Sequence, residues 1–353
     1  MFSREVSLIK KQLTTFDIIF TYIGTIIGAG FASGQEINTF FCSYGIGGIV
    51  GIIIAILFFI YLSRYLIKKG YEICADSYEN YFVGIKSETV KRLFDAFIVF
   101  FLMGSVTAMM SGAGAFTEQV LGFNKYIGSI FFVIIVVGLV IGGIKYIANI
   151  NKIIVPFIIL STLIISYLGV KNGNNVLLLN EFDGINIKAI FSGVLYACFN
   201  IVTAISILPV LGSNAKSENS IKKATLIGGI AIGLMVFISY VAMLANYDII
   251  MNVEIPIEVI ARKVGVISSY IYSTSFLIAI FTTAVSALYG VYTRFAENKF
   301  YLLLVVILTY ICSLAGFSTV VAYLYPFMGY MGIVMLGFII WSNRRINHPS
   351  DVA

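Results

Sequence analysis

The stretch that decides the fold is Thr21-Tyr-Ile-Gly-Thr-Ile-Ile-Gly-Ala-Gly-Phe-Ala-Ser-Gly-Gln-Glu36, near the beginning of the chain. It starts as an apolar helix and then brings Gly28, Gly30 and Gly34 into one short segment. Each glycine weakens a helix by roughly 1 kcal/mol relative to alanine, so the helix is expected to unwind here. Unwound backbone in a bilayer lacks hydrogen-bond partners unless it is buried or lines a cavity. The stretch therefore predicts a binding site for a polar solute in the middle of a membrane protein.

The composition agrees with a membrane protein. Hydrophobic residues make up 59% of the chain, charged residues only 11%, and the mean hydropathy is +0.98. The net charge of +6 does not indicate a nucleic-acid partner, because the basic residues are scattered between apolar blocks. We interpret them as determinants of membrane topology, with lipid as the surroundings of the chain. The residues do not indicate an oligomeric state.

The distribution of reactive side chains argues against an enzyme. The four cysteines have neither metal-binding nor paired spacing, and the single histidine, His348, lies in a polar tail. Membrane metalloproteases need histidine ligands, and aspartyl proteases need two carboxylates that meet. The candidates Asp17 and Glu36 lie on one predicted helix, roughly 28 Å apart along its axis. We therefore expect neither an active site nor a resident cofactor.

Apolar blocks long enough to cross about 30 Å of hydrocarbon predict ten membrane segments. They fall at residues 14–43, 46–68, 93–116, 127–147, 149–170, 187–211, 222–246, 266–293, 300–316 and 319–341. With a cytoplasmic N-terminus, the outside would hold few of the 23 Lys and Arg residues, namely Lys125, Lys171, Lys188, Arg262 and Lys263. This asymmetry predicts that both termini are cytoplasmic and that residues 342–353 form a cytoplasmic tail.

The ten segments divide near residue 175 into two halves of one transmembrane domain, residues 1–353. The first repeat covers residues 14–170 and the second covers residues 187–341. Because each half has five crossings, the second half starts on the opposite side of the membrane and any repeat must be inverted.

The sixth segment carries a second sign of interruption. It places polar residues in an apolar span and ends at Pro209, which lacks a backbone donor. The polar residues are Asn200, Thr203 and Ser206. We expect the discontinuity around Tyr196–Asn200. Interrupted helices at matching positions of inverted halves point to the solute site of a secondary transporter, whereas the alternative is that small residues only let helices pack closely.

The eighth segment adds a third feature. Thr282, Thr283 and Ser286 bring hydroxyl groups onto adjacent faces of a helix. Hydroxyl and carbonyl oxygens suit a partly dehydrated alkali cation. The alternative is that these hydroxyls bond their own helix backbone, which is common in membranes.

With these motifs in view, the chain resembles the amino acid–polyamine–organocation (APC) transporter superfamily, and within it the YkvI-type bacterial membrane proteins. The resemblance rests on Ile27-Gly-Ala-Gly-Phe-Ala-Ser-Gly-Gln-Glu36 and Tyr196-Ala-Cys-Phe-Asn200, and in segment order it covers essentially the whole chain. It implies an all-α, LeuT-like fold of ten transmembrane helices in a five-plus-five inverted repeat, with helices 1 and 6 broken. It also implies a multi-pass protein of the bacterial plasma membrane.

The resemblance further implies a substrate site. In this fold the amides of the first break hold a carboxylate, which assigns that role to Gly28, Ala29 and Gly30. Carbonyls of the sixth helix would hold an ammonium group, and an aromatic ring would close over the substrate side chain. The sixth-helix residues implicated are Tyr196, Ala197, Cys198, Phe199 and Asn200. The third segment is expected to line the pocket with Ser105, Thr107, Met109, Met110 and Ser111.

Sodium-coupled members of the superfamily use two first-helix carbonyls and an Ala-x-x-Thr-Ser/Thr pattern in the eighth helix. The residues that match are Gly24, Ile27, Ala279, Thr282 and Thr283. Some proton-coupled relatives carry a lysine in the fifth helix instead. This chain has Val155-Pro-Phe there, and Lys152 lies nearer the cytoplasmic side, which favours sodium.

Two features leave alternatives open. Glu36 follows the first break and is interpreted as a gating residue, a proton carrier or an acid at a half-helix N-terminus. Residues 252–265 contain an amphipathic helix after Pro256, which either rests at the outer membrane surface or forms a lid over an external vestibule.

Together these patterns predict a secondary transporter that carries a small zwitterionic solute, an amino acid, in symport with sodium by alternating access. The alternatives are a receptor-like, nutrient-sensing member of the same fold and a proton-coupled transporter.

Overall fold

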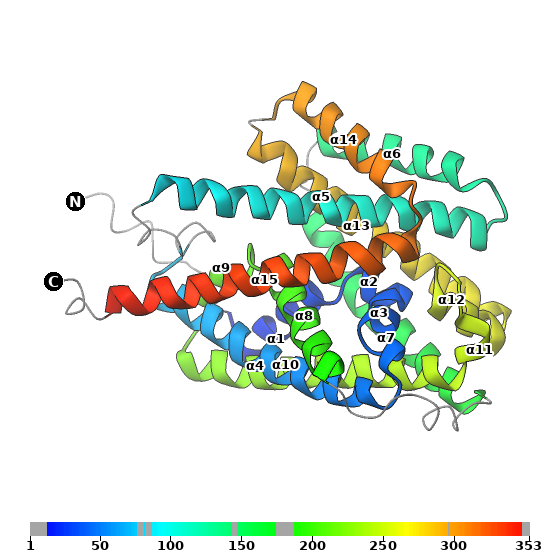
Figure 1. The fold of residues 1–353 in the computed structure, drawn as a ribbon, viewed down its shortest axis with the longest axis horizontal. Helices are drawn as coiled ribbons and strands as arrows, with labels where there is room; N and C mark the ends of the chain where they lie inside the picture. The colour runs from blue at the N-terminus through cyan, green and yellow to red at the C-terminus, as the bar shows by residue number, and fades with distance from the viewer. Residues whose placement is uncertain are drawn as a thin grey trace.

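The computed structural model describes residues 13–75, 81, 87–142, 147–173, 187–295 and 297–347, without the side chains of residues 142–155 and 343–347. His348 lies outside the described residues, as does most of the polar loop that joins the second and third membrane segments. Figure 1 shows an all-helical molecule whose long helices run roughly parallel to one another.

Ten membrane segments are recognisable in the described part of the chain, at the predicted places. Five helices are long and apolar enough to cross a membrane, and five shorter apolar helices accompany them. The first half consists of α1 to α3 (Thr15–Ile26, Ala29–Ser33 and Gln35–Phe40), α4 (Gly47–Glu72), α5 (Glu88–Gln119), α6 (Lys125–Gly142) and α7 (Ile147–Lys171). The second half consists of α8 and α9 (Ile187–Thr203 and Leu208–Ser213), α10 (Glu218–Ala245), α13 (Val266–Arg294), α14 (Lys299–Ser313) and α15 (Phe317–Asn347). Three short helices, η1 (Cys42–Tyr44), α11 (Tyr247–Ile250) and α12 (Pro256–Val264), lie in connections.

The helices form two packed groups. In the first, α4 packs on α8, α9 and α10, and α1 packs on α10. In the second, α5 packs on α6, α13 and α14. Two helices join the groups, because α15 contacts both α8 and α5 while α7 contacts both α10 and α13.

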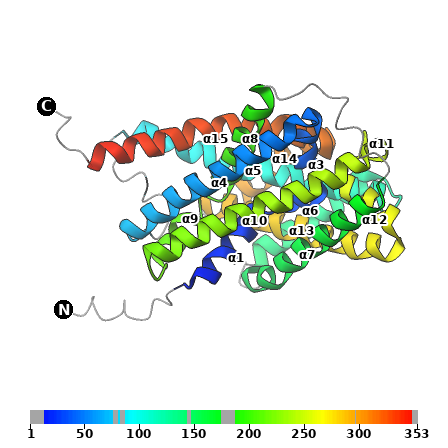
Figure 2. The same ribbon diagram turned by 90° about the horizontal axis from the view of Figure 1, so that it is seen from below.

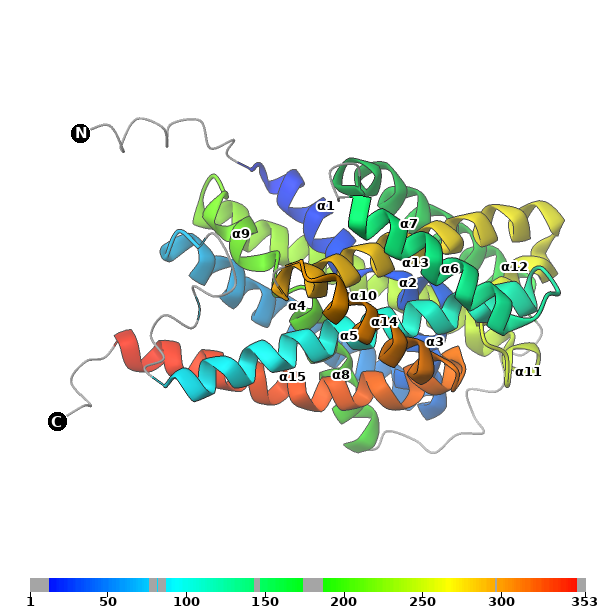
Figure 3. The ribbon, with the colours of Figure 1, turned by 90° about the horizontal axis from the view of Figure 1, so that it is seen from above.

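The two ends of the molecule differ. Figures 2 and 3 show that α1 begins and α15 ends at the same end, which we call the terminal end. The opposite end, where α12 lies, is called the distal end. The helix α15 continues to Asn347, past the predicted boundary at residue 341. The fold thus places the predicted cytoplasmic side at the terminal end and the predicted outside at the distal end.

The first membrane segment is broken where the glycines predict it. The side chains of Thr14 and Asp17 cap the start of α1 reciprocally. The helix ends at Ile26, and Ile27 and Gly28 are extended before α2 begins. A second interruption follows at Gly34, whose φ of +87° is a conformation that glycine adopts without strain. The prediction of a broken first helix is confirmed.

The sixth membrane segment is also broken, but the predicted position is wrong. The helix α8 runs without interruption through Tyr196 and Asn200 as far as Thr203, and irregular turns precede α9 at Leu208. Pro209 explains the position, because its ring clashes with the carbonyl of residue 205 and it cannot donate to that carbonyl. The side chain of Asn200 donates to the carbonyl of Tyr196 (3.0 Å) and so satisfies itself within the helix.

Candidate functional site

The break in the first segment exposes backbone polar groups near the middle of the membrane span. The last carbonyls of α1, including that of Gly24, and the amides of Gly28, Ala29 and Gly30 cannot find partners within their own helices. A Cβ atom placed on Gly28 would have no atom within 4 Å, so this residue borders open space. The structure therefore places amide donors and carbonyl acceptors close together in the chain, with Gly28 bordering open space and Ala29 and Gly30 buried.

A buried carboxyl group lies directly beside this break. Glu36 is only 4% exposed, and a Cβ atom on Gly30 would overlap its Oε1 atom. The carboxyl group of Glu36 is hydrogen-bonded to the side chain of Tyr196 on α8. The ring of Tyr325 on α15 reaches within 3.1 Å of the same point beside Gly30. Glycine at position 30 is thus what makes room for the carboxyl group, because any larger residue would displace it.

One oxygen of this carboxyl group is unused. Oε2 of Glu36 is buried and has no hydrogen-bond partner in the described part of the chain. Burying a polar oxygen without a partner costs about 1–3 kcal/mol, and an unpaired charge costs more. Such a group is expected to meet a partner at some stage of the functional cycle.

The sixth-helix residues whose carbonyls are predicted to hold an ammonium group lie before the break. Tyr196, Ala197 and Cys198 belong to the uninterrupted part of α8, so their carbonyls take part in helical bonding. The carbonyl of Asn200 accepts the amide of Ala204 (3.1 Å). These carbonyls take part in helical bonding in this conformation, and their role in holding an ammonium group stays a prediction.

The side chains of the same segment do lie near the break. The ring of Tyr196 packs among Phe40, Phe41 and Phe59 at centroid distances of 5.3, 5.0 and 5.8 Å. The ring of Phe199 stacks on Tyr325 at 4.4 Å. The sixth segment thus contributes aromatic side chains, rather than carbonyls, to the surroundings of Glu36.

The third-segment residues predicted to line the pocket lie in the interior of α5. Thr107 and Ser111 donate their hydroxyls to carbonyls of their own helix, at 2.9 Å and 3.1 Å. Met109 and Met110 are buried, and Ser105 is half-buried. Their part in binding a solute stays a prediction.

The residues of the predicted sodium site lie on two elements. Gly24 and Ile27 flank the end of α1, where carbonyls lack helical partners. Ala279, Thr282 and Thr283 lie on α13, and Thr282 donates its hydroxyl to the carbonyl of Ala279 (3.2 Å). That bond matches the alternative in which hydroxyls bond their own helix, but it leaves the lone pairs of the Thr282 oxygen available. The sodium site stays a prediction.

The distal end is closed over the break. Ile257 of α12 is fully buried, and a Cβ atom on Gly34 would approach its Cγ1 atom to 2.8 Å. The side chain of Gln35 donates to the carbonyls of Val253 (2.6 Å) and Glu254 (3.1 Å), and Tyr272 of α13 donates its hydroxyl to the carbonyl of Ala32. Because α12 also buries Glu258, Ile260 and Ala261, it is inserted between helices and does not rest at the membrane surface. Of the two alternatives for residues 252–265, the structure supports the lid.

A single glutamine at the end of α5 holds this lid. Gln119 accepts the amide of Ile255 (3.1 Å) and donates to the carbonyl of Ile255 (3.1 Å) and the carboxylate of Glu258 (3.0 Å). Arg262 donates both to Glu258 (3.0 Å) and to the carbonyl of Gln119 (3.0 Å). Sequence reasoning missed Gln119, because its partners are more than a hundred residues away.

Replacing Gln119 by alanine is expected to loosen the lid. The amide of Ile255 would lose its acceptor, so hydrogen exchange over residues 252–258 should become faster, as measured by mass spectrometry on the purified protein. Glu118→Ala is the control, because Glu118 forms only an exposed ion pair with Lys125, and such pairs contribute little. Equal exchange in the two variants would contradict the role of Gln119.

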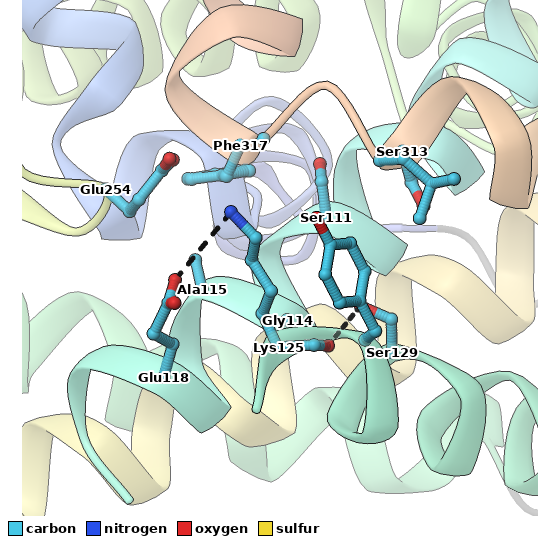
Figure 4. A pocket seen from close by; sticks show the side chains of 12 residues that line it. Ser111, Gly114, Ala115, Glu118, Lys125, Ser129, Glu254, Ser313 and Phe317 are labelled. Atoms are coloured by element: carbon cyan, nitrogen blue, oxygen red, sulfur yellow. Dashed lines mark hydrogen bonds and ion pairs between the residues drawn. The ribbon is translucent and has the colours of Figure 1, made fainter. Parts of the chain in front are cut away.

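Among the described residues, hollows also occur away from the break, and two of them differ widely in size. The first, shown in Figure 4, lies between α5, α6 and the turn before α15, with Glu118, Lys125 and Glu254 around it. It offers about 20 Å³, which suits a single water molecule rather than an organic solute. The second, of about 420 Å³, is lined by Tyr44, Ile187, Lys188, Phe191, Ser192, Leu195 and Tyr330. Neither is lined by the glycines of the first break.

Comparison with known proteins gives relatives over nearly the full length. No family model matches the chain. It is 27% identical to the uncharacterized membrane protein YkvI of Bacillus subtilis over 333 residues, which cover 92% of this chain and 94% of YkvI. The chain is homologous to YkvI. It is also 24% identical to the uncharacterized protein YyaD of the same organism, over 89% of this chain and 92% of YyaD. The predicted resemblance to YkvI-type membrane proteins is confirmed.

Solved structures establish the fold. The inward-facing conformation of Mhp1 superposes with a TM-score of 0.60 at 18% identity, covering 93% of this chain and 76% of Mhp1. A manganese transporter of Eremococcus coleocola superposes with a TM-score of 0.58 at 12% identity, covering 92% of this chain and 77% of that protein. The chain therefore has the LeuT-like fold predicted for it and is a multi-pass membrane protein. Both of these neighbours are transporters.

Mhp1 also offers a comparison between conformations. Its closed conformation with bromovinylhydantoin bound superposes with a TM-score of 0.51, lower than the 0.60 of the inward-facing one.

Sequence reasoning singled out Glu36 but not Tyr325, which lies beside it. The tyrosine precedes Pro326 inside α15. A polar residue beside a helix-interrupting proline in an apolar span is the only local signal that could have drawn attention to it.

Proposed function

We propose that this protein is a secondary active transporter that moves a small zwitterionic organic solute, an amino acid, across the bacterial plasma membrane by alternating access. One observation carries the proposal: the interruption of the first membrane segment at Ile27–Gly28, beside open space, in a fold whose sixth segment is interrupted as well. The amides of Gly28, Ala29 and Gly30 would hold the carboxylate of the solute.

An organic solute fits the described residues better than a transition metal ion does. In the described part of the chain, no group of three or more His, Cys, Asp or Glu residues lies together in a way that could hold a metal. Backbone amides, in contrast, are suited to an anionic group at a helix start. The manganese transporter therefore informs the fold of this chain and not its substrate.

Sodium is the proposed coupling ion. The carbonyls of Gly24 and Ile27 at the end of α1, the carbonyl of Ala279 and the hydroxyls of Thr282 and Thr283 would supply five uncharged oxygens. Such oxygens suit an alkali cation, and α13 is connected to the first segment through the bond from Tyr272 to Ala32.

The structure fits a conformation that is open toward the terminal end, which we take to be cytoplasmic. The distal end is closed by α12, and polar residues on the terminal side of the breaks are exposed: Thr21, Thr203 and Ser206. A solute would leave along this side after the distal end has closed.

Uptake into proteoliposomes tests the proposal. Purified protein is reconstituted and supplied with a mixture of radiolabelled amino acids under an inward sodium gradient. We expect many solute molecules to accumulate per protein molecule, and no accumulation in protein-free vesicles. Saturable binding without flux would instead support the receptor-like, nutrient-sensing alternative. The absence of both binding and flux would contradict the proposal.

A further inference from the structure

We infer that Glu36 is the counter-ion for a positively charged ammonium group of the transported solute, and that a proton takes the place of this group when the site is empty. The inference rests on the proposed function and specifies its substrate class. It adds to the sixth-helix carbonyls, which take part in the helical bonding of α8, a side chain that has a free acceptor.

The carboxyl group of Glu36 lies at the place where the solute is proposed to bind. Glu36 lies against Gly30, one of the three residues whose amides are proposed to hold the solute carboxylate. In an α-amino acid the ammonium group and the carboxylate are attached to the same carbon atom, so the nitrogen and the carboxylate carbon are only two bonds apart. A carboxylate acceptor beside an amide donor therefore matches both ends of a zwitterion at one point of the backbone.

One oxygen of the Glu36 carboxyl group has no hydrogen-bond partner among the described residues. Oε2 of Glu36 is buried without a partner, whereas the side chain of Tyr196 bonds to the same carboxyl group. An ionised carboxylate with no cation costs several kcal/mol in a bilayer. The group therefore needs either a proton or a cation from outside the chain.

Among the described side chains, none supplies such a cation next to Glu36. The helix α3 packs on α2, α8, α10, α15 and η1. The ionisable groups facing Glu36 are Tyr196 of α8 and Tyr325 of α15, and α2 has none. Further away, Cys42 of η1 is buried and Tyr240 of α10 donates to the carbonyl of Gly45.

The basic residues of the packed helices are remote. Lys188 precedes Tyr196 by two turns, about 12 Å along α8. On α10, Lys223 lies about 30 Å along the helix from Met243, which approaches Gly34. No described basic side chain on these helices is therefore close enough to neutralise Glu36.

The surroundings of the Glu36 carboxyl group are aromatic. Tyr196 and the stacked pair of Phe199 and Tyr325 place rings beside the carboxyl group. Aromatic faces attract ammonium groups, and they do so more strongly when water is excluded. A carboxylate with adjacent rings is a better match for an ammonium group than for a second anion or a neutral solute.

At Glu36, one proton is exchanged for one ammonium group of the solute. In the proposed cycle, the carboxyl group is neutral and carries its proton while the distal end is closed and the site is empty. When the distal end opens, a solute ammonium group binds the carboxylate, and the proton of Glu36 passes to water. Solute and proton therefore compete for one site, and acidification is expected to weaken binding of the solute.

Three kinds of probe test this inference on the purified full-length protein, with binding followed by thermal shift and calorimetry. The first kind is the common amino acids, the second is primary amines with the same side chains, and the third is the matching carboxylic acids without an amine. We expect binding only by probes that carry an ammonium group, with an affinity that falls as the pH is lowered. In Glu36→Gln the same probes should bind at least about tenfold more weakly, and without dependence on pH.

Two further variants separate a binding role from a structural one. Glu36→Asp retains the charge and should retain the pH dependence, even where affinity falls. Glu118→Gln removes an exposed carboxylate and should leave binding unchanged. If Glu36→Gln does not fold, the pH dependence of the wild-type protein alone decides the matter.

Unchanged affinity in Glu36→Gln, wild-type binding that does not depend on pH, or equal binding of acids that lack an amine would each overturn the inference. Failure of every ammonium-bearing probe to bind the wild-type protein would overturn it too. The proposed function is tested separately from this inference. Uptake that persists in Glu36→Gln would still support a transporter, but it would show that Glu36 is not part of the solute site.

Discussion

Replacing Gly28 by leucine is expected to abolish solute binding and uptake while leaving a folded protein. The backbone at Gly28 has φ of −110° and ψ of −168°, which leucine adopts without strain. A Cβ atom there would touch nothing within 4 Å, so the larger side chain has room in the folded protein. That room is the open space beside the amides of the break, and leucine would fill it. Binding measured by thermal shift and uptake into proteoliposomes should both fall below detection.

A matched control is available elsewhere in the chain. Gly138 of α6 also has nothing within 4 Å of a Cβ position, and it is exposed on the outer side of its helix. Gly138→Leu should therefore bind and transport as the wild type does. Both variants should elute as single folded species and melt at similar temperatures. Undiminished binding in Gly28→Leu would remove the first break from the solute site.

Replacing Thr282 and Thr283 together by alanine is expected to remove the dependence of uptake on sodium. In the wild-type protein, exchange of sodium for potassium should reduce uptake by about tenfold or more, which corresponds to roughly 1.4 kcal/mol of coupling. The double variant loses two of the five oxygens proposed for the ion and should take up solute at the same low rate in either salt. The measurement is the initial rate of uptake into proteoliposomes at a series of sodium concentrations.

The control for this experiment lies on the same helix. Thr293 of α13 donates its hydroxyl to the carbonyls of Tyr289 and Gly290 (3.1 Å each) and is exposed near the terminal end. Thr293→Ala should keep the response to sodium. If the wild-type protein works equally well in potassium, the sodium proposal is wrong and the proton exchanged at Glu36 becomes the remaining candidate for coupling.

The local sequence predicts the position of the first helix break more accurately than the position of the second. The first was placed correctly, because three closely spaced glycines weaken hydrogen bonding at their own positions. The second lies later than the polar residues around Tyr196–Asn200 predict, because Pro209 and not those side chains ends the helix. Proline prevents a helical hydrogen bond to the carbonyl four residues before it. For Pro209 this carbonyl belongs to residue 205, which agrees with the interruption after Thr203.

The hydrogen-bond partners of polar side chains are harder to predict from the sequence than the membrane segments are. Asn200 in an apolar span was interpreted as a sign of interruption, but it bonds to the carbonyl of Tyr196 and leaves the helix intact. The amphipathic pattern after Pro256 fitted both a surface helix and a lid equally well. Periodicity reports that one face of a helix is buried, and it does not report whether lipid or protein covers that face.

The sequence by itself determined the ten membrane segments, their division into a first and a second five along the chain, and the first break. Hydropathy and glycine content act within a few residues of where they occur. The tertiary structure alone decided which groups meet: Glu36 with Tyr196 and Tyr325, Gln119 with the lid, and Ile257 with Gly34. These contacts join residues far apart in the chain. They depend on how helices pack across the membrane, and no local pattern of residues encodes that packing.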